Sequence, residues 1–274
     1  MESIESSDEV TLVPHSAIRK RIARHMAASQ ATAAHVYAMI DVDYGAVDAV
    51  RRALAPRWRS EHGYSLTYLP FVARAVMIAI GQYPNLNARF TDDGLELRRE
   101  VGLGVAVDLN FEGLIVPVIQ QASQLGVPAI AQAIEDLASR TRAGKLRSED
   151  VGGGTFTVSN PGPFGARITL PIISQPQVAI LTVDAIAPRP AVVPDGAVGN
   201  TLGIRPIGNL TLAWDHRAFD GAYAASALSA IRSALESHDW RGEFGSPAAA
   251  ALSSSSPAVV SPTWASTPKH EGES

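Results

Sequence analysis

Residues 209–221 read NLTLAWDHRAFDG, and within them an apolar strand meets a charged turn and then the start of a helix. Leu210, Leu212 and Trp214 alternate with smaller or polar residues, which is typical of a strand with one face in the core. The run breaks at Asp-His-Arg, and Gly221 permits a sharp bend before an apolar helix predicted at 222–235. An imidazole between two charged residues at the end of a core strand indicates a candidate functional site.

The alternation of a strand places His216 on the same face as Trp214, and Asp215 and Arg217 on the other face. Asp215 is therefore poorly placed to orient His216, whereas Asp220 can fold back toward the strand end across the bend. A histidine shielded by an indole favours the neutral imidazole that a general base requires. We interpret His216 as a candidate base with Asp220 as its companion. The plain alternative is a structural histidine at a strand end.

A second candidate lies in TVSNPGPFG, residues 157–165. Ser159 ends a predicted strand and enters a loop rich in proline and glycine, which can hold a hydroxyl rigidly at the edge of a site. Ser, Asn, Pro and Gly also favour turns for local reasons, so the pattern by itself predicts only a turn.

Helices and strands alternate irregularly around these two stretches. Apolar spacing predicts helices at about 18–31, 65–83 and 127–146, and strands at 36–44, 101–109, 114–119, 154–159 and 177–186. The strands on either side of the turn NFEG are expected to form a hairpin. The fold class is therefore α/β, an α+β two-layer sandwich in which helices pack on a mixed sheet.

The composition suits a single large domain. The chain has 274 residues, of which 46% are hydrophobic and 18% charged, enough for a sizeable core without disulfides. We expect a polar arm at 1–16, a folded domain at 17–244, and a disordered tail rich in Ala, Ser and Pro at 245–274.

Several function classes are disfavoured. The absence of cysteine excludes disulfides, thiolate nucleophiles and zinc–thiolate sites, and it fits a reducing cytoplasm. The seven histidines lack metal-ligand spacing, so no metal is expected, and no apolar run is long enough to cross a membrane. The net charge of −4 and the lack of aromatics around the basic run at 19–24 argue against nucleic acid. The glycine motifs at 102–104 and 152–154 do not lie between a strand and a helix, where phosphate loops lie.

The motifs resemble those of a known family. DHRAFDG resembles the D-H-R-x-x-D-G signature of dihydrolipoamide acyltransferases, the catalytic domains at the core of 2-oxo-acid dehydrogenase complexes and distant relatives of chloramphenicol acetyltransferase. GGTFTVSNPGPFG, SQPQVAILTVDAI and QYPNLNA resemble further segments of that family, in the same order. The similarity covers about 17–236.

The resemblance implies a chloramphenicol acetyltransferase-like fold and direct transfer of an acyl group, most simply acetyl, between coenzyme A and a thiol or hydroxyl acceptor. His216 matches the general base, and Ser159 matches the donor to the oxyanion of the tetrahedral intermediate. Asp220 matches an aspartate that holds the site in shape through an arginine pair. Three arginines are candidates for that pair: Arg19, Arg21 and Arg24. The resemblance also implies a homotrimer whose sites take the histidine and the serine from different subunits.

Departures from the family leave the acceptor open. Members in the large complexes carry lipoyl domains before the core, whereas here the core starts almost at Met1, so we expect a free-standing form without its own lipoyl group. Ala34-His35 stands where Pro-His is usual, and the tail replaces a cage-forming segment, which favours a trimer over a cage. The acceptor is then dihydrolipoamide on a separate protein, or a carrier-bound or small-molecule alcohol in a natural-product pathway such as tetronate biosynthesis. A non-catalytic assembly core that kept the fold is the remaining hypothesis.

Overall fold

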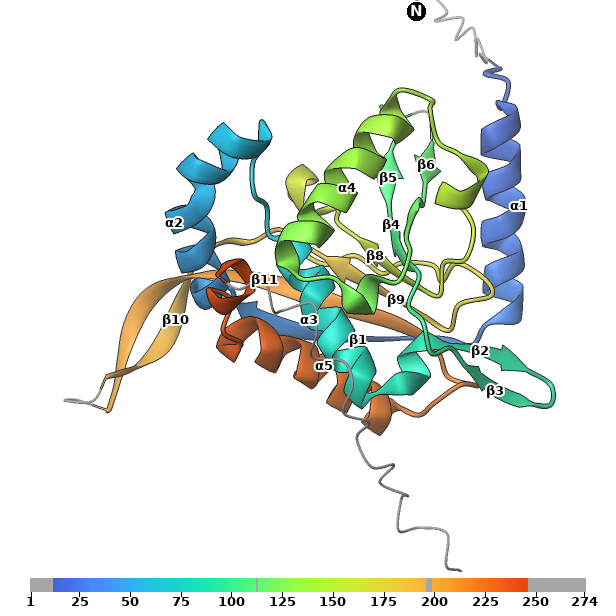
Figure 1. Cartoon of the computed structure of the whole chain (residues 1–274). Coiled ribbons are helices and arrows are strands. Elements are labelled where there is room, and N and C mark those ends of the chain that lie inside the picture. Colours follow the sequence, from blue (N-terminus) through green and yellow to red (C-terminus); the bar gives the residue numbers. More distant parts are fainter. Residues whose placement is uncertain (1–11, 112, 196–198, 246–274) are drawn as a thin grey trace, which may run out of the picture.

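The computed structural model describes residues 12–111, 113–195 and 199–245 (Figure 1). Within them a seven-stranded mixed sheet has the order β1-β11-β9-β8-β4-β7, with β10 paired to β11 beside that path, and β2–β3 and β5–β6 form two small sheets. The strands are β1 His35–Asp43, β2 Ala88–Thr91, β3 Gly94–Leu97, β4 Leu103–Val105, β5 Val107–Asp108, β6 Leu114–Ile115, β7 Val118–Ile119, β8 Phe156–Ser159, β9 Ala179–Val183, β10 Ala187–Asp195 and β11 Gly199–Asp215.

Helices of the described residues lie around this sheet. They are α1 Ala17–Thr32, α2 Gly45–His62, α3 Leu69–Gln82, α4 Val127–Arg142 and α5 Gly221–Ser237, with short 3-10 turns at Pro84–Asn87, Ala122–Gln124, Ser148–Asp150, Gly162–Phe164 and Gly242–Phe244. α3 contacts α4 and α5, and α5 contacts β1 (Figure 1). The predicted mixed sheet with packed helices is confirmed.

The central helix α3 is apolar almost all round because it lies inside the core, where Phe71, Val72 and Val76 are fully buried. Its predicted start at 65 is wrong, since the helix begins at Leu69 with Pro70 in its first turn. Proline suits the first turn of a helix, where its missing N–H has no partner to lose. The helix ends at Gln82, before Pro84, as predicted.

The sequence-based expectations lack helix α2, the β2–β3 hairpin and strand β10. Helix α2 carries Val47, Leu54 and Trp58 on its packed side and ends at Gly63, whose φ of 80° terminates the helix. Strand β11 is much longer than the predicted 209–217, because its first half pairs with β10 in a ribbon that extends away from the body (Figure 1).

The predicted arm at 1–16 and tail at 245–274 lie almost entirely outside the described residues and stay predictions. The regular elements run from Ala17 to Phe244. No helix of the described ranges combines the length and the apolar character that a membrane crossing requires.

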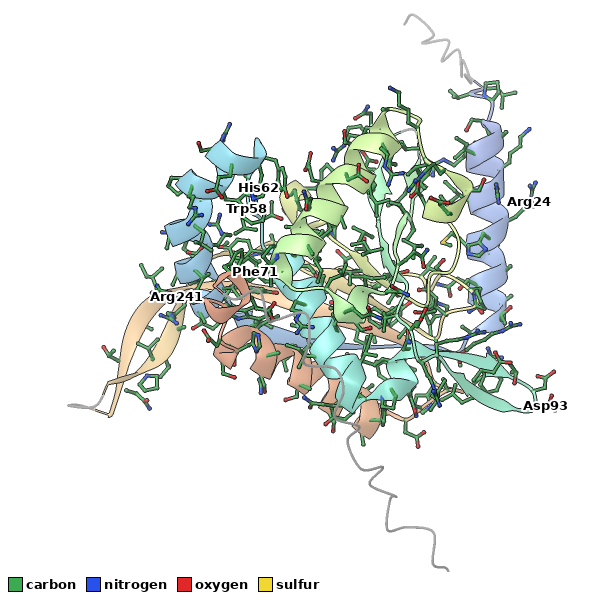
Figure 2. The ribbon with its side chains drawn as sticks, viewed as in Figure 1. Arg24, Trp58, His62, Phe71, Asp93 and Arg241 are labelled. Atoms are coloured by element: carbon green, nitrogen blue, oxygen red, sulfur yellow. The ribbon has the colours of Figure 1, made fainter. Side chains whose placement is uncertain are left out.

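A buried carboxylate fastens the C-terminal turn to the helices. Glu243, 9% exposed, accepts hydrogen bonds from Arg74 (2.9 Å) and from the backbone N–H of Val127 (3.2 Å), and it lies 3.0 Å from Nε2 of His238. Burial would raise the pKa of Glu243, but the hydrogen bonds from His238 and Arg74 lower it to about 2. Phe244, the residue after Glu243, packs its ring against Trp58 and Phe71 (Figure 2).

Glu243→Gln should lower the free energy of unfolding at pH 7 by about 2–3 kcal/mol. The neutral amide leaves the Arg74 guanidinium in the interior without its negative partner. The folded-state pKa lies below the ordinary carboxyl value of 4.5, so this stabilisation is present above pH 4.5 and is lost as the pH falls toward 2. Urea unfolding at pH 7 and pH 3 should show the deficit shrinking in acid. Glu61→Gln, in an exposed ion pair with Arg57, is the control and should change little at either pH.

Two glycines let β4 and β8 begin side by side. The N–H of Thr155 donates to the carbonyl of Gly102 (2.8 Å), and the N–H of Gly102 donates to the Thr155 hydroxyl (3.0 Å). A Cβ atom on Gly102 would collide with the carbonyl oxygen of Gly153. The approach of these two segments therefore requires glycine at position 102.

Gly102→Ala should cost about 1–3 kcal/mol of unfolding free energy, since backbone must move to admit the methyl group. Gly81→Ala is the matched control, because its Cβ would meet open space on α3 and alanine favours helix. That control should be neutral or stabilising. Equal thermal midpoints for the two variants would contradict the close approach.

Candidate active site

The turn that carries His216 is built by backbone hydrogen bonds. The N–H of His216 donates to the carbonyl of Ala34 (2.9 Å), and the N–H of Ala218 donates to the carbonyl of Asp215 (2.9 Å). β11 therefore ends at Asp215, two residues before the predicted end of the strand. The imidazole of His216 is 45% exposed, and its ring centroid lies 6.2 Å from that of Trp214. A firmly held turn thus presents a partly shielded imidazole to solvent.

Asp215 fastens this turn through Arg217 and the backbone of Ala34. Its carboxylate, 1% exposed, accepts from Nη2 of Arg217 (2.7 Å) and from the N–H of Ala34 (3.2 Å). Burial would raise the pKa of Asp215, but the hydrogen bonds from Arg217 and the backbone lower it below its ordinary value. The Arg217 guanidinium also lies over the Phe90 ring, 4.4 Å from its centre. The expected separation of His216 from its sequence neighbours agrees with this geometry.

Asp220 lies where the sequence predicts, at the bend before α5. Its Oδ1 is 3.9 Å from Nδ1 of His216, and its side chain is 90% exposed. The ion pairs of the described residues include none between Asp220 and an arginine, and Arg217 is already engaged by Asp215. The pairing of Asp220 with an arginine of α1 stays a prediction.

Ser159 ends β8, and its hydroxyl makes no hydrogen bond within the described part of the chain. It is in register with Thr182 of β9, which faces Thr211 of β11. β11 runs antiparallel to β9, so His216 lies five residues beyond Thr211, at the opposite end of the sheet. At about 3.3 Å per residue and about 4.8 Å per strand, the two Cα atoms are roughly 19 Å apart. One chain does not bring Ser159 and His216 together.

An aromatic pair marks the Ser159 end of the sheet. Phe164, in the loop after Ser159, and Phe111 have ring centroids 6.2 Å apart and exposed fractions of 68% and 81%. Phe111 has a φ of 67°, which is uncommon for a large side chain and holds its ring outward. The turn NFEG was predicted, but nothing in the sequence indicated that it would meet the loop after Ser159.

His35 connects the two ends of the site. The backbone N–H of Ile173, in the long loop after Ser159, donates to Nε2 of His35 (3.1 Å), and Nδ1 of His35 lies 3.1 Å from the carbonyl of Ala33. Ser29 donates to the carbonyl of the same Ile173 (2.6 Å). These bonds assign the proton to Nδ1. The residue next to the unusual Ala34 therefore anchors the loop that leads from Ser159 back to the His216 end.

The described residues contain no group of three His, Cys, Asp or Glu side chains that is arranged to hold a metal ion. What the arrangement offers is acid–base chemistry: one accessible imidazole on a rigid turn, and one unbonded hydroxyl at the far end of the sheet.

Comparisons with known proteins agree with this chemistry. The family model of the 2-oxoacid dehydrogenases acyltransferase (catalytic domain) matches residues 7–240. The chain is 34% identical over 227 residues to the lipoamide acyltransferase component of the branched-chain alpha-keto acid dehydrogenase complex of Bacillus subtilis, with 83% of this chain and 52% of that protein covered. It is 40% identical over 206 residues to the dihydrolipoyllysine-residue acetyltransferase component of the pyruvate dehydrogenase complex of Corynebacterium glutamicum, with 74% and 30% covered.

Solved structures give the same result. The probable dihydrolipoamide acetyltransferase of Listeria monocytogenes superposes with a TM-score of 0.79 at 34% identity and covers 84% of this chain and 97% of that one. The dihydrolipoamide acetyltransferase of Azotobacter vinelandii superposes at 0.78 with 27% identity, covering 89% and 98%; in that protein a serine, a histidine and an asparagine four residues later were studied for their roles in catalysis.

The chain belongs to the 2-oxoacid dehydrogenase acyltransferase catalytic-domain family. The predicted family, fold and enzyme class are thereby confirmed. The matched segment spans about half or less of the length of these curated relatives.

Arg217→Ala should lower the unfolding free energy by about 2–3 kcal/mol, because it leaves the buried Asp215 carboxylate without its cation. The double variant Arg217→Ala/Asp215→Asn should recover part of that loss. Arg99→Ala is the control, because Arg99 is exposed and has no hydrogen bond or ion pair within the described ranges. A double-mutant cycle from urea unfolding measures the coupling, and additive effects would show that the pair contributes nothing.

Proposed function

We propose that the chain transfers an acetyl or related acyl group between coenzyme A and the thiol of a dihydrolipoyl group carried on a partner. The observation that carries this proposal is the accessible imidazole of His216, held on a rigid turn that diverts Asp215 to Arg217. The relatives are named for acyl transfer to lipoamide or dihydrolipoyl-lysine, which favours a thiol acceptor over an alcohol. A cytoplasmic location stays a prediction of the sequence.

The mechanism follows from the two side chains. His216 takes the proton of the attacking thiol, and the thiolate adds to the thioester carbonyl of the acyl donor. The oxyanion of the tetrahedral intermediate accepts a hydrogen bond from the Ser159 hydroxyl. Collapse breaks the bond to the first sulfur, whose thiolate recovers the proton from His216. A positioned base typically contributes about 10²–10⁴-fold, and one oxyanion donor about 10²–10³-fold.

A second copy of the chain must complete the site. The base and the oxyanion donor act on the same reacting group, so both must lie within hydrogen-bond reach of it. Ser159 and His216 of one chain stand at opposite ends of the sheet, and the exposed pair Phe111 and Phe164 beside Ser159 is an apolar surface suited to a partner. We assign the two residues of each site to neighbouring subunits of a homotrimer.

Asp220 is proposed to act on His216 and not on the substrate. Its carboxylate lies 3.9 Å from Nδ1 of His216, close enough to stabilise the imidazolium formed when the thiol proton is taken. The Azotobacter relative was studied with an asparagine at the same spacing from its histidine, which is consistent with a role in holding the ring. An arginine of a neighbouring subunit is then free to pair with Asp220 in the assembly.

Subunit complementation tests the shared site. His216→Ala and Ser159→Ala should each lose most acetyl transfer from acetyl-CoA to dihydrolipoamide while keeping the fold and the trimeric mass. When equal amounts of the two variants are unfolded and refolded together, random assembly leaves both native residues at about a quarter of all interfaces in the population of cyclic trimers. Recovery of about a quarter of wild-type activity is expected in the mixture.

The control is the same mixture prepared without refolding, in which subunits do not exchange and activity should stay low. An inactive refolded mixture of correctly assembled trimers would contradict the shared site. A small alcohol acceptor assayed beside dihydrolipoamide tests the acceptor class, since preference for the alcohol would replace the thiol proposal with an O-acyltransferase. Wild-type protein that transfers to neither acceptor would support the non-catalytic assembly core.

A further inference from the structure

A cavity of about 310 Å³ lies at the His216 end of the sheet and has no role in the mechanism above. It is bounded by the β2–β3 hairpin, by the turn before β8, and by the residues that lead into β9. Arg89 and Arg98 line it from the hairpin, Gly153 and Gly154 from the turn, and Gln177 from the approach to β9. Figure 2 shows Asp93 at the far tip of the same hairpin, pointing into solvent.

The cavity has a net positive lining. Arg89 is exposed and forms no ion pair or hydrogen bond within the described part of the chain. Arg98 pairs with Glu96 at 3.1 Å, but both side chains are half-exposed, and such surface pairs hold their partners weakly. Two guanidinium groups therefore face the cavity, and only one of them has a carboxylate partner.

Backbone and amide donors add to this charge. The N–H groups of Gly152, Gly153 and Gly154 donate no hydrogen bond within the described residues. Gly153 has a φ of 76°, and successive amides around a left-handed residue converge on one point, which makes a concavity that binds anions. Gln177 accepts from the Thr157 hydroxyl through Oε1 (2.7 Å), which leaves its NH₂ group as a further donor.

The strand register fixes the distance from the candidate base. β9 and β11 are antiparallel and pair Ala179 with Trp214. Two residues further along the same register, Gln177 lies opposite His216. The parallel register of β8 and β9 likewise places Gly154 beside Gln177. Two strand spacings of about 4.8 Å put Gly154 roughly 10 Å from His216, on the same edge of the sheet. This is within reach of a substrate whose thiol contacts the imidazole.

We propose that this cavity is an anion subsite that binds a phosphate or carboxylate group of the acyl-CoA substrate through Arg89, Arg98 and the amides of the 152–154 turn. The inference rests on the proposed acyl transfer and assigns these residues to substrate selection. This subsite differs from a glycine-rich phosphate loop, which connects a strand to a helix. Here the donors lie in a turn that leads into a strand. A phosphate would come from the nucleotide of coenzyme A, and a carboxylate from a dicarboxylic acyl chain.

The test compares Arg89→Gln, Arg98→Gln and the double variant with Arg99→Gln, an exposed arginine beside the cavity that does not line it. Acetyl-CoA, succinyl-CoA and S-acetylpantetheine serve as donors, with dihydrolipoamide as acceptor. The double variant should raise KM about tenfold or more for the donor that carries the recognised anion, with kcat nearly unchanged. Arg99→Gln should leave all three values unaltered.

The donors distinguish the two sources. A loss with both CoA esters but not with S-acetylpantetheine identifies a phosphate, and a loss confined to succinyl-CoA identifies the acyl carboxylate. Unchanged KM values for every donor would overturn the subsite. Calorimetric titration with coenzyme A and with succinate separates this failure from that of the proposed function. If the wild type turned over no donor, weaker binding of either probe by the double variant would still support the subsite, and equal binding would refute it.

Discussion

The direction of β11 is the constraint on which the site depends. β11 pairs with three strands, β1, β9 and β10, and it runs antiparallel to β9 and β8. Ser159 and His216 both stand at the C-terminal ends of their strands, and antiparallel strands have those ends at opposite edges of a sheet. The two residues are therefore separated by the fold itself. No change of rotamer or loop conformation closes a gap that is set by strand direction.

The sequence predicts local structure well where one pattern dominates. Alternation from Leu210 to Trp214 and the bend at Gly221 give the last strand and helix, and Asp215 pairs with Arg217 and not with His216. The helix α2 was missed although Val47, Leu54 and Trp58 have helical spacing, because Gly45 and Pro56 suggest loop when seen alone. The β10–β11 ribbon was missed because proline recurs in β10, and proline is tolerated there only since the ribbon stands at the edge.

The residue patterns alone predict the residue types of the site, and only the resemblance to the family predicts that its two halves come from different subunits. A histidine followed by aspartate at the fourth position, and a serine before Asn-Pro-Gly, are visible as motifs. Their separation depends on strand order and direction, which are long-range properties of the chain. The anchoring role of His35 is invisible in the sequence, because it depends on the Ile173 amide that the fold brings near its imidazole. Arg217 pairs with Asp215 nearby in the chain, and only its contact with the Phe90 ring depends on the fold.

Each edge of the sheet then carries a different half of the chemistry. The His216 edge holds the base together with two arginines and a turn of unbonded amides, so it can take both the reactive thiol and a negative charge on the same substrate. The Ser159 edge supplies a neutral hydroxyl beside two exposed aromatic rings, which carry no charge to hold an anionic group of the substrate. In the shared site that we propose, an anionic donor that enters from a neighbour's Ser159 edge would be drawn toward the His216 edge. That asymmetry would give the substrate one preferred direction through the site that we propose between two subunits.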